Sequence, residues 1–134
     1  MSEYMLQKEY IVQEYLDKPL LVNNKKFDLR IYVLVTSINP LIAFIADEAL
    51  VRFCTEDYEK PDKSNMKNVL GHLTNYSLNK MSDKYVNCTD LTKQEEATKR
   101  TLTSLWEQFK EMGIPTEDII NQINEVCTKA LIAI

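Results

Sequence analysis

Three charged residues in the first third of the chain, Lys26, Asp28 and Arg30, have a spacing that could support chemistry. The segment 27–36 alternates apolar and polar side chains and is rich in β-branched and aromatic residues, which predicts a β-strand. Side chains two residues apart share one face of a strand, so the three charges would form a polar platform. Such a platform could hold phosphate oxygens through its cations while the carboxylate orients them. The same pattern is typical of the solvated outer face of a sheet, and spacing alone leaves both interpretations open.

A second candidate is Arg52, which interrupts the apolar segment 49–55. An unpaired charge in such a strand costs free energy, so this guanidinium should have an anionic partner. That partner is either a protein carboxylate such as Glu48 or a carboxylate or phosphate of a ligand, which arginine binds through two parallel hydrogen bonds. The sequence does not decide between them.

Two further segments carry polar groups that a site could use. Residues 71–77 combine histidine, threonine, asparagine, tyrosine and serine, although such residues also satisfy the backbone of turns. His72 is the only histidine, and we interpret it as a hydrogen-bonding loop residue rather than an acid–base group. Lys99 and Arg100 fall inside a predicted helix, where we interpret them as part of its solvated face.

The elements that must position these residues follow from the apolar pattern. Strands are expected over residues 8–16, 27–36, 41–46 and 49–55, loops over 56–68 and 81–91, and an irregular polar segment over 71–80. One helix is expected to begin at Thr92, with Glu95 completing a capping box, and to stop at Gly113. Pro115 opens a second helix. The expected fold class is α+β, an antiparallel sheet followed by two helices, in a single domain over 1–134.

Composition narrows the function classes. The sequence has 134 residues, 45% of them hydrophobic and 27% charged, which suits one globular domain. A net charge of −4 argues against nucleic acid as a partner, and two glycines are too few for a Walker loop or a dinucleotide fingerprint. We expect neither a signal peptide nor a membrane span. Three widely spaced cysteines favour free thiols in a reducing compartment.

Four blocks of sequence, taken in order, resemble the tubulin tyrosine ligase-like family. They are VQEYLDKPLL at 12–21, KFDLRIYVLV at 26–35, LVRF at 50–53 and HLTNYSLNK at 72–80. Their order and spacing make the resemblance far more specific than any single block. It implies a partial ATP-grasp fold, closest in motif to the tubulin polyglutamylases.

Members of that family join an amino acid to a protein carboxylate through an acylphosphate made with ATP and Mg²⁺. The resemblance therefore implies an ATP-dependent ligase that adds free glutamate to tubulin or microtubule tails, without nucleic-acid or membrane partners. It implies a location in the cytoplasm, at the cytoskeleton or at the cilium and basal body. Tyr76 and Ser77 favour glutamate over tyrosine or glycine. An alternative from a different class is a non-catalytic remnant of the family that binds tubulin or another protein.

Site residues are carried over by resemblance, position by position. Arg30, near the phosphates, and Arg52, on the carboxylate of the incoming amino acid, are the expected catalytic residues. Tyr76, Ser77 and Lys99 would also contact the amino acid, although Arg100 stands where the family has tryptophan. The nucleotide site would comprise Gln13, Glu14, Tyr15, Leu16, Lys26, Phe27, Asp28, Thr74 and Asn75.

Parts of the family pattern lie outside these residues. A phosphate-binding lysine and a glycine-rich loop precede the block at 12–21 in the family, and its Mg²⁺ ligands follow the last helix. A hard cation needs several oxygen ligands. We therefore expect no metal ligand within the 134 residues and no ligation from them alone.

Overall fold

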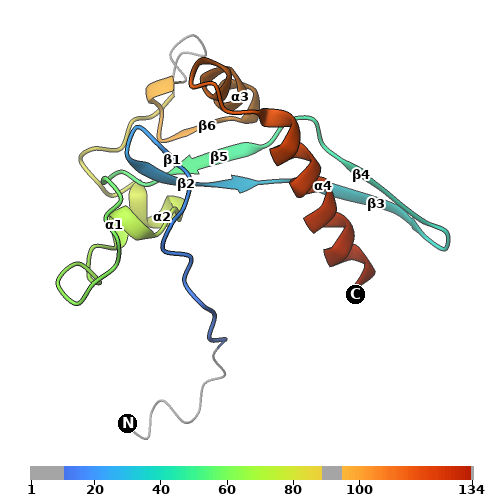
Figure 1. The fold of residues 1–134 in the computed structure, drawn as a ribbon, viewed down its shortest axis with the longest axis horizontal. Coiled ribbons are helices and arrows are strands. Elements are labelled where there is room, and N and C mark those ends of the chain that lie inside the picture. Colours follow the sequence, from blue (N-terminus) through green and yellow to red (C-terminus); the bar gives the residue numbers. More distant parts are fainter. Residues whose placement is uncertain (1–10, 89–94, 134) are drawn as a thin grey trace, which may run out of the picture.

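The computed structural model describes residues 11–88 and 95–133 (Figure 1). Its strands are β1 Leu21–Val22, β2 Lys25–Arg30, β3 Val33–Ile38, β4 Leu41–Ile45, β5 Leu50–Phe53 and β6 Lys99–Thr101. Its helices are α1 Val69–His72, α2 Tyr76–Asn79, α3 Leu102–Glu111 and α4 Thr116–Ile132. Antiparallel strands thus precede two long helices, which confirms the predicted α+β class.

The larger sheet has the strand order β1-β2-β5-β6, and β3 and β4 form a separate hairpin. One face of this sheet packs against α3. Val51 and Phe53 of β5 meet Leu105 and Phe109 of α3 in the core, where each is at most 2% exposed. Burying one such side chain contributes roughly 1.5–3 kcal/mol. This layer fixes the sheet and leaves its opposite face to polar residues.

The predicted strand 27–36 is two strands with a break at Ile31 and Tyr32. β2 pairs with β5 in the large sheet, whereas β3 pairs with β4 in a hairpin that extends away from it (Figure 1). The Ala46 amide donates to the Tyr32 carbonyl at 3.0 Å beside the break. Because the alternation of apolar and polar residues continues through this point, periodicity did not reveal it.

The predicted strand over 8–16 is wrong in its described part. Residues 11–16 have no regular structure, and residues 8–10 lie outside the described ranges. Ile11 and Val12 are 97% and 93% exposed, so nothing in the described ranges packs on them. An apolar segment becomes a strand only where a neighbour takes up its backbone hydrogen bonds.

The segment before α3 is a strand, so the prediction that Lys99 and Arg100 are helical is wrong. Residues 99–101 form β6 against β5, and α3 begins at Leu102; the expected start at Thr92 lies outside the described residues. The Thr101 hydroxyl caps α3 by accepting from the Ser104 amide at 3.2 Å. Strand alternation turns Arg100 toward the core, where it is 7% exposed.

The remaining expectations for the helical half hold. Gly113 has a φ of +69° just after α3, which confirms the predicted helix end. Glu117 and Asp118 lie in the first turn of α4, where the helix dipole favours them. The polar segment 71–80, expected to be irregular, instead contributes to the short helices α1 and α2. No helix in the described ranges is long and apolar enough to cross a membrane.

Candidate ligand-binding site

The sheet face that points away from α3 carries a row of charged side chains on three neighbouring strands. Asp28 of β2 lies in register with Arg52 of β5, and Arg52 lies in register with Lys99 of β6. Side chains at such paired positions share a face and lie within contact distance. We call Asp28, Arg52 and Lys99 the charged row. It brings together three residues from distant parts of the sequence that were all predicted to belong to the site.

Asp28 is the protein partner of Arg52. The guanidinium Nε donates to Asp28 Oδ1 at 2.8 Å, and Nη2 donates to Oδ2 at 2.6 Å. Thr74 donates its hydroxyl to the same Oδ2 at 2.8 Å. The hydrogen bond to Asp28 raises the pKa of Arg52 above its ordinary value. Because a guanidinium has five N–H donors and these two bonds use two, Arg52 can still bind a ligand anion.

Glu48, the alternative partner considered for Arg52, serves a different purpose. Its Oε1 accepts from the backbone amides of Ala49 at 2.9 Å and Leu102 at 2.6 Å, and its Oε2 accepts from the Thr103 hydroxyl at 2.8 Å. Burial alone would raise the pKa of Glu48, but these hydrogen bonds outweigh it and the pKa lies below its ordinary value. Glu48 therefore joins the start of β5 to the N-terminus of α3.

Replacing Glu48 by alanine is expected to lower the free energy of unfolding by about 1 kcal/mol, as for the loss of a helix N-cap. The depressed folded-state pKa means that the stabilisation is fully present above the ordinary pKa of 4.5. It is lost as the pH falls through the lower, folded-state value. Denaturant unfolding at pH 7 and at pH 3.5 should show a larger loss at pH 7. Glu107→Ala, an exposed site on α3, is the control, and equal losses at both pH values would contradict the role of Glu48.

Lys26 lies beside the charged row and is held by the segments around it. Its Nζ donates to the Tyr15 hydroxyl at 3.0 Å and to the His72 carbonyl at 2.9 Å, and lies 4.5 Å from the centre of the Tyr15 ring. The buried His72 ring meets the edges of Tyr15 and Tyr58 at centroid distances of 6.1 and 5.7 Å. The histidine is thus packed between two tyrosines, and Lys26 joins the chain around Tyr15 to the sheet.

The other predicted site residues make fewer contacts with the charged row and with one another. Lys99 Nζ lies 5.7 Å from the centre of the Tyr76 ring, at one end of the charged row. Phe27 turns to the core and packs on Phe53 at a centroid distance of 5.3 Å, so only its backbone faces the polar side. Arg30 shares the face of Asp28 and is exposed, without a hydrogen bond or ion pair to any described residue. Gln13, Glu14, Leu16, Asn75 and Ser77 are exposed.

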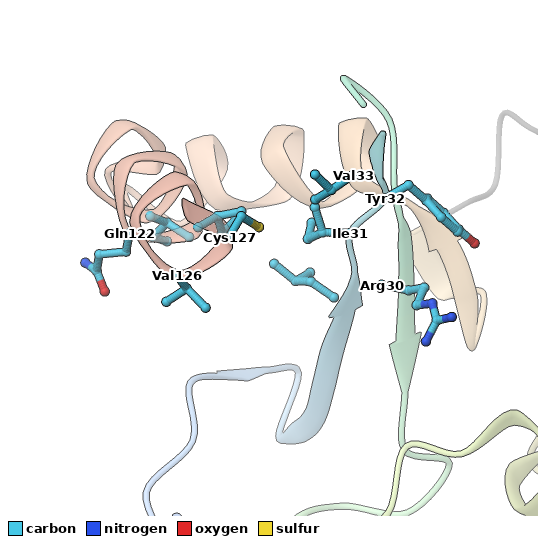
Figure 2. A pocket seen from close by; sticks show the side chains of 10 residues that line it. Arg30, Ile31, Tyr32, Val33, Gln122, Val126 and Cys127 are labelled. Atoms are coloured by element: carbon cyan, nitrogen blue, oxygen red, sulfur yellow. The ribbon is translucent and has the colours of Figure 1, made fainter. Parts of the chain in front are cut away.

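A groove of about 640 Å³ runs between the end of β2 and α4. Figure 2 shows Ile31 and Val33 on one side of it and Val126 and Cys127 on the other. Arg30 also contributes to the lining of this groove, but its guanidinium extends away from α4 (Figure 2). The apolar groove and the charged row therefore lie on opposite sides of β2.

Asn79 is a site-supporting residue that the sequence did not reveal. It is 1% exposed and joins the chain just after β5 to the segment around Thr74. Only its place in a turn-rich polar segment, within the block at 72–80 that resembles the family, hinted at a role. Among the residues that the structure describes, no group of three or more histidine, cysteine, aspartate or glutamate side chains is placed to hold a metal ion.

Comparison with known proteins places the chain in a family. The sequence model of the Tubulin-tyrosine ligase family matches residues 1–134, so the chain belongs to that family. It is 44% identical over 129 residues to the tubulin polyglutamylase ttll-11 of Caenorhabditis elegans, covering 96% of this chain and 18% of the relative. It is 43% identical to the tubulin polyglutamylase ttll6 of Danio rerio, covering 92% and 15%. The tubulin polyglutamylase TTLL11 of Mus musculus is 40% identical, with 92% and 17% covered. The chain thus spans less than a fifth of the length of each of these relatives.

Proposed function

We propose that this chain is part of an ATP-dependent ligase that adds glutamate to the tails of tubulin. The observation that carries the proposal is the charged row, with Thr74 bonded to Asp28, on the sheet face opposite the core. A ligase of this kind must bring an acidic acceptor and ATP together. Fixed cations such as Arg52 and Lys99 offset the repulsion between these anions and orient them.

The residues present fit a nucleotide. Tyr15 offers an aromatic ring for the base, and its hydroxyl bonds to Lys26, which would contact the base and sugar region. Asp28 and Thr74, already joined by a hydrogen bond, would hold the sugar side, with Asn75 next to them. Arg30 is exposed on the same face and would lie near the phosphates. Gln13, Glu14, Leu16 and the backbone of Phe27 would complete the site.

Glutamate suits the other end of the charged row. Arg52 would hold one carboxylate through the donors that Asp28 does not use. Lys99, with Tyr76 beside it, adds a second cation in the next strand, and Ser77 follows in sequence. Two neighbouring cations fit a dicarboxylic amino acid better than tyrosine or glycine, which carry one carboxylate each.

Bound ATP would supply the phosphoryl group that activates the acceptor carboxylate, and Mg²⁺ would offset the negative charge of the nucleotide. For the magnesium ion itself, the described residues offer no ligand cluster, and we assign it none of their side chains. The working location that follows from the proposal is the cytoplasm, on microtubules or at the cilium and basal body. Nucleic acid and membranes are not proposed as partners.

A second candidate is a non-catalytic protein that binds tubulin or another partner. It is favoured by the bidentate pair of Arg52 with Asp28, which gives the arginine an anionic partner without any ligand. A ligase would need further residues that supply the phosphate-binding loop and the Mg²⁺ ligands, whereas a binding protein would not.

The mass of the native protein in its own cells separates the two candidates. A mass several-fold above 15.6 kDa would favour the ligase. That longer form should incorporate labelled glutamate into tubulin only when ATP and Mg²⁺ are present, while the 134 residues alone should not. A native mass near 15.6 kDa, or no incorporation by a longer form, would favour the binding protein.

A further inference from the structure

Every hydrogen-bonding group of the Asn79 side chain has a partner. Its Oδ1 accepts from the Thr55 amide at 2.8 Å and from the Thr55 hydroxyl at 3.0 Å. Its Nδ2 donates to the Leu73 carbonyl at 2.7 Å and to the Asn75 carbonyl at 3.1 Å. A carboxamide offers two donors and one oxygen with two lone pairs, so its capacity is filled. With 1% of its surface exposed, the side chain is closed to solvent.

These bonds connect two parts of the site that are distant in sequence. Thr55 lies just after β5, the strand that carries Arg52. Leu73 and Asn75 flank Thr74, whose hydroxyl binds Asp28 at 2.8 Å. The same amide therefore fixes the backbone on both sides of Thr74 to the end of β5. α2 has four residues, and a helix of one turn does not hold its shape without such support.

We propose that Asn79 is a positioning residue for the nucleotide part of the site. By holding the carbonyls of Leu73 and Asn75 it fixes Thr74 against Asp28 and sets the place of Asn75 beside them. This inference rests on the proposed function and assigns a role within the same site. Because Asn79 is buried, it acts through Thr74 and Asn75 and does not itself contact a ligand. Its loss should raise the KM for ATP more than the KM for glutamate, which binds at the Arg52–Lys99 end of the row.

Asn79→Asp is the sharpest test, because it keeps the size and the oxygen that accepts from Thr55 but replaces the donor nitrogen with a second oxygen, which repels the Leu73 and Asn75 carbonyls. Asn121→Asp, at an exposed position of α4, is the matched control. Both are made in the longest form of the chain that its own cells produce. Affinity for a non-hydrolysable ATP analogue is measured by calorimetry, and the two KM values by glutamate incorporation. We expect Asn79→Asp to weaken analogue binding about 10- to 100-fold, the cost of two unmade buried hydrogen bonds. Asn121→Asp should match the wild type.

A folded Asn79→Asp variant with unchanged analogue affinity would overturn the inference, as would an equal rise in both KM values. If that variant does not fold, Thr55→Val and Thr55→Ser take its place. Thr55→Val removes the hydroxyl that donates to Asn79, whereas Thr55→Ser keeps it. The inference requires weaker analogue binding in Thr55→Val and recovery in Thr55→Ser, and equal affinities would refute it. If the wild type itself fails to bind the analogue, the proposed function fails rather than the role of Asn79 within it.

Discussion

Replacing Arg52 by alanine is expected to lower kcat/KM for glutamate addition about 100- to 1,000-fold, as when a preorganised charged donor is removed from an active site. The fold should survive, because the side chains of the Arg52–Asp28 pair are 31% and 35% exposed. Exposed ion pairs contribute up to about 1 kcal/mol to stability, and this bidentate, partly exposed pair should lie at the upper end of that range. The measurement is steady-state glutamate incorporation by the longest natural form of the chain, together with its thermal unfolding.

Two further variants test whether the effect of Arg52→Ala comes from the guanidinium at this position or from the loss of any cation. Arg52→Lys keeps the charge but lacks the planar set of donors that binds Asp28 bidentately and leaves further N–H groups for a ligand carboxylate, so it should recover little activity. Lys129→Ala removes a cation from an exposed ion pair on α4, and it should leave activity unchanged. A rise confined to the KM for glutamate would show that Arg52 binds the substrate equally in the ground and transition states. Full activity in Arg52→Ala would mean that Arg52 only pairs with Asp28, and the assignment of the amino-acid site would be wrong.

The polar platform of β2 was predictable because its information is local. Alternation placed Lys26, Asp28 and Arg30 on one face. The register with β5 then shows that Asp28 pairs with Arg52 there, a partner that the sequence analysis did not name. Lys99 also lies in the charged row, but the sequence did not predict the strand that places it there. β6 has three residues and owes its strand structure to pairing with β5, so its own pattern gave no signal.

Glu48 and Asn79 show why the rest of the site could not be predicted. Glu48 accepts a hydrogen bond from the Leu102 amide, 54 residues away, and Asn79 accepts from Thr55, 24 residues away. Periodicity and capping patterns carry information only within one element or between sequence neighbours. A polar side chain that joins two elements therefore becomes visible only when the fold brings them together. The ligand contacts of the site residues stay predictions, because each is tested only by binding or turnover.

Arg30→Ala is expected to separate activity from folding more cleanly than Arg52→Ala. Arg30 is exposed on the face of Asp28 and makes no hydrogen bond or ion pair with a described residue. Its removal should therefore change the free energy of unfolding by less than about 0.5 kcal/mol. If it faces the phosphates, its loss should lower kcat for glutamate incorporation about 100-fold and raise the KM for ATP. Melting curves and kinetics on the same preparation measure both effects.

Because the Arg30 guanidinium makes no ion pair with a described residue, the controls must test whether its positive charge or its position matters. Arg30→Lys should retain part of the activity, because an ammonium still attracts phosphate but cannot form the bidentate hydrogen bonds of a guanidinium. Lys63→Ala, in an exposed loop, removes the same charge elsewhere and should have no effect. If Lys63→Ala slowed the reaction as much as Arg30→Ala, a long-range field would explain both, and added salt would abolish the difference from wild type. If Arg30→Ala alone were slow and stayed slow in salt, Arg30 would contact the reacting phosphates directly.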